Sequence, residues 1–143
     1  MTSQACQIGP YRASDQADVV ALWEDVFRGD PPANAPLGMI QRKLTVQPEL
    51  FLVARVDGAL AGTVLAGFDG VRGWIHHLAV APGFRRRGIA SALMRAAEAG
   101  LLALGCPKVN LQVRTTNAEV VAFYRSLGYA VEERLSLGKR ISD

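Results

Sequence analysis

Two Asp-Gly pairs, each between apolar runs, constrain the fold of this chain more than any other feature. The runs and pairs alternate as LFLVARV (50–56), Asp57-Gly58, ALAGTVLAGF (59–68), Asp69-Gly70 and GWIHHLAVAP (73–82). Asp-Gly readily adopts the positive φ angles that tight hairpin turns require. The pattern therefore predicts an antiparallel meander of three strands.

Helical periods and further strand signals flank the meander. We expect the other elements in this order: a strand at 6–12, a helix at 15–27, a Pro-rich loop at 28–38, a short helix at 38–46, a long helix at 89–104 capped by Gly105, a strand at 108–114, a helix at 118–128 and a strand pair within 129–141. With 143 residues the chain is too short for two ordinary domains. We therefore predict one α/β domain, residues 1–143, with a mixed sheet and about four helices.

Charge and cysteine content exclude several classes of protein. A net charge of +3 is too small for most nucleic-acid binders. Cys6 and Cys106 are far apart without CxxC or Cys/His spacing, so neither a disulfide framework nor a zinc site is expected. No apolar run reaches the roughly 18 residues of a membrane span. A cytoplasmic location without membrane attachment is the expectation.

Three consecutive arginines stand at the start of the long predicted helix. Arg85, Arg86 and Arg87 directly precede Gly88, after which the apolar stripe begins. The first turn of a helix carries amides without helical acceptors and a partial positive charge, so three cations there are unfavourable unless an anion binds. We therefore expect a phosphate-containing ligand at this helix start.

Two common phosphate-binding motifs do not fit this segment. The spacing from Gly83 to Gly88 is that of a P-loop, but Ile89 and Ala90 follow where a Lys and a Ser or Thr would contact phosphate and magnesium. The GxGxxG pattern of dinucleotide-binding folds does not occur in the sequence. Neither nucleotide hydrolysis nor a nicotinamide or flavin dinucleotide is expected.

Two sequence blocks carry a family resemblance. The first is RxxGxA, here Arg85, Gly88 and Ala90, directly after the strand LAVAP, and the second is TNAEVVAFYRSLGY at 116–129. Together they resemble the GNAT superfamily of acyl-CoA-dependent N-acetyltransferases, whose pyrophosphate loop lies between a strand and a long helix. The predicted order of strands and helices is consistent with that fold. In addition, SLGKR and GCPKVNLQV are similar to the small bacterial YpeA-like subgroup.

The resemblance implies that acetyl-CoA is the acyl donor and that no metal takes part. The pantetheine arm would pair with the strand at 78–80, where this strand splays away from the parallel strand at 108–114, and the pyrophosphate would bind the arginine-rich loop. The implied ligand-binding residues are Leu78, Ala79, Val80, Arg85, Arg86, Arg87, Gly88, Ile89, Ala90, Ser91, Asn117 and Tyr124. Structural roles stay open beside these: a buried strand at 78–80, a solvated basic face, and a capping box of Thr116 with Glu119.

The same resemblance assigns the catalytic residues. Tyr124 would protonate the thiolate that leaves when an amine takes up the acetyl group, although it could equally be a core aromatic residue. The base is harder to assign, because Trp74 and Gln112 occupy positions where relatives carry Glu. His76 is the candidate base and is expected on the opposite face of its strand from His77, with the glutamates at 132–133 as fallbacks.

The sequence thus favours an enzyme that passes acetyl from acetyl-CoA directly to a primary amine in a ternary complex. A non-catalytic acyl-CoA-binding or sensing module stays open because of the missing carboxylates; a small nucleic-acid binder is less consistent, since the arginines lack interleaved aromatics. The acceptor is not identified. The resemblance implies that the loop at 28–38 forms the wall of the acceptor site, where Trp23, Phe27, Asp30 and Met39 could line it or could equally pack the core. A homodimer is left open.

Overall fold

Both Asp-Gly pairs lie in hairpin connections, as predicted. Strands β2 (Phe51–Val56), β3 (Ala59–Phe68) and β4 (Gly73–Val80) form the antiparallel meander. Asp57 and Gly58 have φ angles of 51° and 81°, the positive values of a two-residue type I′ turn. In the longer β3–β4 connection, Asp69 Oδ1 accepts hydrogen bonds from the amides of Val71 and Arg72, both at 2.8 Å.

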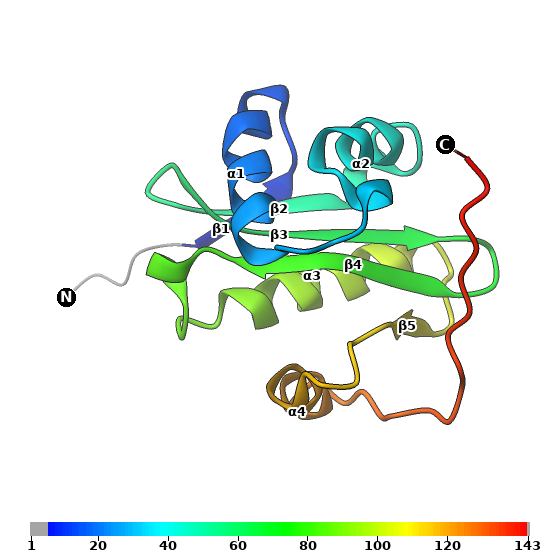
Figure 1. Cartoon of the computed structure of the whole chain (residues 1–143). Coiled ribbons are helices and arrows are strands. Elements are labelled where there is room, and N and C mark those ends of the chain that lie inside the picture. The colour runs from blue at the N-terminus through cyan, green and yellow to red at the C-terminus, as the bar shows by residue number, and fades with distance from the viewer. Residues whose placement is uncertain (1–5, 143) are drawn as a thin grey trace. The chain divides into compact units, whose positions relative to one another are not determined.

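The computed structural model describes residues 6–142 and separates into two units, which meet in the sequence between Gln112 and Val113. The first unit contains a five-stranded sheet in the order β1-β2-β3-β4-β5, with β1 at Cys6–Pro10 and β5 at Val109–Leu111 (Figure 1). Neighbouring strands are antiparallel except for the parallel pair β4 and β5. The expected mixed sheet is therefore confirmed.

Helices cover both faces of this sheet. Helices α1 (Gln16–Val26) and α2 (Pro36–Lys43) lie on one face, and α3 (Ile89–Ala103) lies on the other (Figure 1). The α1 face is closed by a buried cluster that includes Trp23, Phe51 and Leu65. Helix α3 ends as predicted, since Gly105 has a φ of 85° and the Cys106 amide bonds back to the Leu101 carbonyl at 3.1 Å. Among residues 6–142, no helix is long and apolar enough to cross a membrane.

Strand β4 departs from regular geometry at its centre. Leu65 of β3 faces His76, whereas Thr63 faces Ala79, so β4 contains one extra residue in this interval. His77 takes a left-handed φ of 49° within this β-bulge. Strand β5 pairs with β4 only from Gly73 to Ile75, and β4 then continues to Val80. Pairing of the parallel strands thus ends at Ile75 and Leu111, directly before the bulge.

The second unit begins after Gln112 and contains helix α4 (Ala118–Ser126). The predicted strand at 108–114 is limited to Val109–Leu111. The strand pair predicted within 129–141 was wrong, because residues 127–142 contain no strand. An isolated hairpin is marginal without an apolar face to bury, and Leu135, Leu137 and Ile141 are all more than 90% exposed.

A buried hydrogen-bond chain joins α1 to the bulge. Thr63 is fully buried; its Oγ1 accepts from Trp23 Nε1 at 2.9 Å and donates to the His77 carbonyl at 3.0 Å. We expect Thr63→Val to lower the free energy of unfolding by about 2–4 kcal/mol, because two buried polar groups lose their partner. Urea unfolding measures this. Thr45→Val is the control: Thr45 is exposed, so the loss of its bond to the Arg42 carbonyl should cost much less.

Candidate functional site

The arginine-rich loop has an unusual backbone just before α3. Arg86 has a φ of 63° and Gly88 a φ of 74°, so two of its residues are left-handed within three positions. A left-handed conformation is unfavourable for a residue such as arginine and is common at ligand-binding loops. The first helical bond of α3 runs from the Ala92 amide to the Gly88 carbonyl at 3.0 Å. The amides of residues 89–91 therefore precede the helical bonding pattern, as the phosphate-site prediction requires.

The arginine side chains are arranged around this turn and remain accessible. Arg85, Arg86 and Arg87 are all exposed. Arg85 Nε donates to the Val80 carbonyl at 3.4 Å, and the Arg87 guanidinium lies over the Phe84 ring, 5.3 Å from its centre. A Cβ atom built on Gly88 would meet nothing within 4 Å. The helix start thus combines accessible positive charge with open space above its backbone.

The strand before the loop lies in the same unit. Residues 78–80 belong to the part of β4 beyond its pairing with β5. Ala79 and, after the loop, Ile89 each have only 3% of their surface exposed. Their side chains belong to the core, so a ligand could reach only the backbone at these two positions. The predicted site residues 78–80 and 85–91 therefore lie in one unit, at the end of β4, in the loop and at the start of α3.

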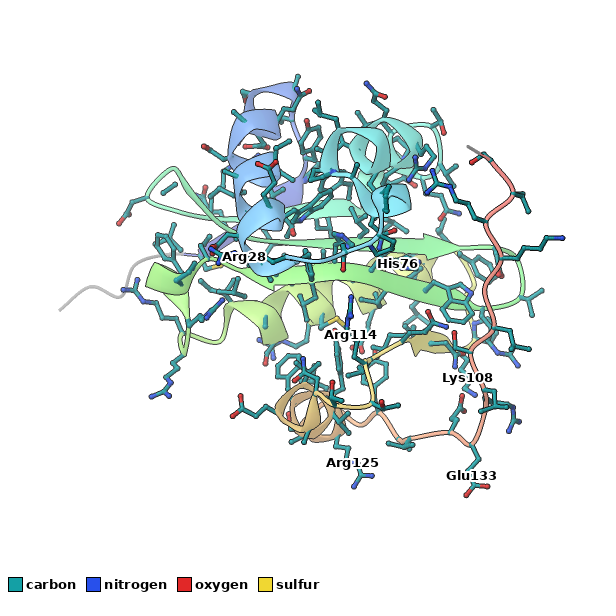
Figure 2. The ribbon with its side chains drawn as sticks, viewed as in Figure 1. Arg28, His76, Lys108, Arg114, Arg125 and Glu133 are labelled. Atoms are coloured by element: carbon teal, nitrogen blue, oxygen red, sulfur yellow. The ribbon has the colours of Figure 1, made fainter. Side chains whose placement is uncertain are left out.

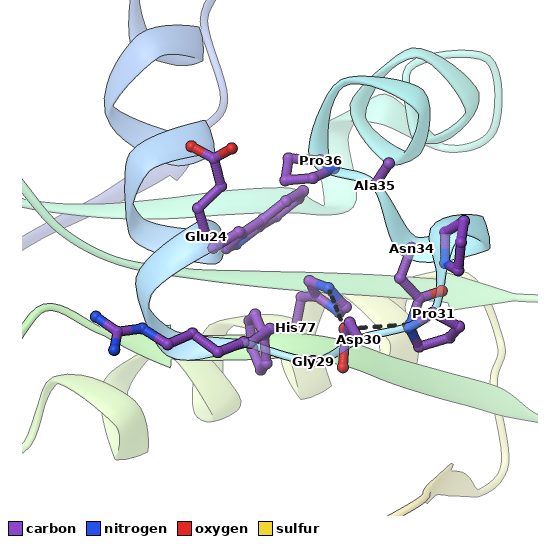
Figure 3. A pocket seen from close by; sticks show the side chains of 12 residues that line it. Glu24, Gly29, Asp30, Pro31, Asn34, Ala35, Pro36 and His77 are labelled. Atoms are coloured by element: carbon purple, nitrogen blue, oxygen red, sulfur yellow. Dashed lines mark hydrogen bonds and ion pairs between the residues drawn. The ribbon is translucent and has the colours of Figure 1, made fainter.

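A pocket of about 400 Å³ opens beside α1 and the loop that follows it. Trp23, Phe27 and Asp30 line it, together with His77 (Figure 3). The His77 ring lies 4.9 Å from the Trp23 ring and 4.2 Å from the Phe27 ring. Met39 packs against the core cluster, which is the alternative that the sequence left open for it.

His76 and His77 lie on the same face of the sheet, which corrects the expectation of opposite faces. His76 faces Leu65 across the strands and therefore shares the α1 and α2 side, where Figure 2 shows it over the sheet. The bulge adds one residue and so interrupts the alternation. Desolvation, and then the Lys43 ammonium, lowers the pKa of His76. His76 is absent from the pocket lining, whereas His77 is part of it.

Trp74 occupies one of the positions where relatives carry a glutamate, and its side chain is bound elsewhere. Trp74 Nε1 donates to Asp69 Oδ2 at 3.3 Å, which ties it to the β3–β4 turn. The fallback glutamates, Glu132 and Glu133, are exposed in the second unit, and Figure 2 shows Glu133 extending away from the ribbon. Neither observation supplies a base.

The second unit holds the two remaining predicted residues. Asn117 is the N-cap of α4, since its Oδ1 accepts from the Val120 amide at 3.3 Å. The helix therefore begins one residue later than a Thr116–Glu119 capping box requires. Tyr124 is 8% exposed, and burial raises the pKa of its phenol to about 12. The rings of Phe123 and Tyr129 contact it edge-on.

Comparison with known proteins decides the family. The profile of the Acetyltransferase (GNAT) family matches residues 17–129. An acetyltransferase of Yersinia enterocolitica is 45% identical over 137 residues, covering 94% of this chain and 95% of that protein. An acetyltransferase of Pectobacterium atrosepticum is 44% identical over the same shares of both chains. The chain belongs to the GNAT family.

Solved structures agree with this GNAT assignment. Ard1 from Thermoplasma volcanium superposes with a TM-score of 0.77 at 27% identity, over 90% of this chain and 84% of that one. The aminoglycoside N-acetyltransferase AAC(6')-Iy, solved with CoA, gives a TM-score of 0.80 at 20% identity over 97% of both chains, which shows the shared fold. The family model and the relatives together identify the chain as an acetyltransferase of the GNAT family.

The sequence did not predict one contact that lines the pocket. His77 and Asp30 are brought within 3.6 Å of each other, measured from Nε2 to Oδ2, although 47 positions separate them. The sequence contains only two hints of this contact: the two adjacent histidines and the Pro-rich loop that contains Asp30. The bulge that turns His77 toward α1 leaves no mark in the hydrophobic pattern.

Proposed function

We propose that the protein transfers acetyl from acetyl-CoA to a small primary amine by direct attack in a ternary complex. The observation that carries this proposal is the left-handed turn at Arg86 and Gly88, which leads into α3 shortly after the part of β4 that extends beyond its pairing with β5. The amides from Arg86 to Ser91 would bind the pyrophosphate. The side chains of Arg85 to Arg87 would add charge, and the backbone of Leu78 and Val80 would pair with the pantetheine arm.

The pocket beside α1 supports a small acceptor. Its volume of about 400 Å³ lies in the range of small-molecule sites. Aromatic rings of Trp23 and Phe27 supply apolar walls, while Glu24 and Asp30 supply carboxylates that would attract an ammonium group. An amine with an apolar or aromatic body therefore fits this lining better than a long acidic or peptide acceptor.

Tyr124 is proposed as the acid that protonates the departing thiolate, and Asn117 as a contact to the pantetheine. A phenol with a pKa of about 12 stays protonated throughout the neutral range, so it keeps a proton to donate. An acceptor amine with a pKa near 10 must lose protons to a base before and during attack. His76 is the base that the resemblance suggests.

Thiol release tests the proposal. Acetyl-CoA should release free CoA in proportion to enzyme when a primary amine is present, using phenethylamine, tyramine, spermidine and kanamycin as probes. Release that depends on the amine and saturates with it supports acetyl transfer. Binding of acetyl-CoA in calorimetry without amine-dependent release by any probe would instead indicate a binding module.

A further inference from the structure

Two aromatic rings and a hydrogen bond to its backbone carbonyl hold His77 in the pocket. Its ring meets the rings of Trp23 and Phe27, and only 9% of its side chain is exposed. Its carbonyl accepts the bond from Thr63, which also anchors Trp23. The left-handed backbone of the bulge and this hydrogen-bond chain therefore fix where the imidazole lies.

Asp30, in the loop after α1, lies next to the His77 imidazole. Its Oδ2 lies 3.6 Å from His77 Nε2 and accepts a hydrogen bond from Asn34 Nδ2 at 3.3 Å (Figure 3). Only 18% of the Asp30 side chain is exposed, so solvent screens this pair less than a surface pair. An imidazole beside an oriented carboxylate is the arrangement that stabilises an imidazolium after proton uptake.

We propose that His77 is the base of the acetyl transfer, taking the proton from the acceptor nitrogen, and that Asp30 is its positioning residue. This inference rests on the proposed function and names the base that function needs. The amine nitrogen forms a bond to the acetyl carbonyl carbon and gives its proton to the His77 imidazole. The C–S bond breaks with its electron pair on sulfur, which takes up a proton, so that one proton moves in net from nitrogen to sulfur.

The charges around His77 are consistent with a base that starts neutral. Burial lowers its pKa, Asp30 opposes this, and a charge on His76 would lower it further. From α1, Glu24 and Arg28 also line the pocket, and Arg28 is paired with Asp25 at 2.8 Å. On α2, Lys43 acts on His76. Since the acid form of His77 is inactive in this scheme, kcat falls as the pH drops through the pKa of His77.

The test is the pH profile of kcat with acetyl-CoA and the best amine of the probe set. We choose His77→Asn because asparagine tolerates a left-handed φ yet cannot accept the proton. We expect kcat to fall about 100-fold and the acid limb to vanish, with unchanged calorimetric affinity for acetyl-CoA. Asp30→Asn should keep the limb but move it to lower pH, because the contribution that raises the pKa of His77 is removed.

The competing variant is His76→Asn, which should retain the acid limb. The proposal is overturned if the limb survives in His77→Asn, if it disappears in His76→Asn instead, or if Asp30→Asn lowers kcat equally at every pH. The last outcome would mean that the loop only shapes the pocket. If no probe amine gives thiol release with the wild-type enzyme, the proposed function fails and the His77 assignment fails with it. If the wild type releases thiol but the variants do not behave as expected, only the His77 assignment fails and acetyl transfer stands.

Discussion

Gly88→Val is expected to weaken acetyl-CoA binding about 100-fold, or about 2.8 kcal/mol. Gly88 has a φ of 74° at the first turn of α3, where a β-branched residue is strained. A Cβ atom at this position would meet nothing within 4 Å, so the space next to the backbone is open. The valine side chain would occupy the volume where the pyrophosphate approaches the backbone, and the helix start would shift. Isothermal titration calorimetry with acetyl-CoA measures the effect.

The matched control for this variant is Gly58→Val. Gly58 also has a positive φ, 81°, and also has open space around its Cβ position, but it lies in the β2–β3 turn. Both variants should lose similar stability, about 1–2 kcal/mol for a left-handed residue with a side chain. Only Gly88→Val should lose ligand affinity. Equal acetyl-CoA affinity in the two variants would remove the helix start from the proposed site.

Tyr124→Phe is expected to lower kcat about 100-fold while leaving the affinity for acetyl-CoA nearly unchanged. The substitution keeps the ring that contacts Phe123 and Tyr129 but removes the proton that the phenol would give to the leaving sulfur. Steady-state thiol release at saturating acetyl-CoA and amine measures kcat. Because the phenol pKa is about 12, the wild-type enzyme should show no loss of kcat through Tyr124 ionisation near neutral pH.

Tyr129→Phe is the control for loss of a phenol in the same aromatic cluster. Its ring centre lies 5.6 Å from that of Tyr124. We expect kcat close to that of the wild type, since Tyr129 has no assigned role in proton transfer. If both variants lose kcat to the same degree, packing rather than proton donation explains the effect, and the role of Tyr124 is withdrawn.

The meander and the long helix were predictable because their signals are local. Asp57-Gly58 encodes its own turn, and the stripe from Ile89 to Leu101 with Gly105 encodes both the buried face and the end of α3. The arginine stretch is likewise local, since a helix start and its charge can be read within a few residues. These elements carry the predicted ligand loop at 85–91.

The relation of His77 to α1 was not predictable, because it depends on pairing between strands. A β-bulge arises when one strand contains an extra residue relative to its partner. Here β4 has the extra residue, between the Leu65–His76 and Thr63–Ala79 pairs. Period-two alternation therefore placed the histidines on opposite faces. The strand pair predicted within 129–141 failed for a related reason: alternating apolar residues such as Leu135 and Leu137 form strands only where a partner edge or core receives them.

Single-turnover transfer of a deuterium-labelled acetyl group tests the central claim most directly. Enzyme in excess is mixed with trideuteroacetyl-CoA and the best probe amine, and the products are identified by mass spectrometry at successive times. The account predicts that the label appears on the amine nitrogen with first-turnover kinetics and that no acetylated enzyme accumulates. Label found only in free acetate, or first on the protein, would contradict direct acetyl transfer to an amine.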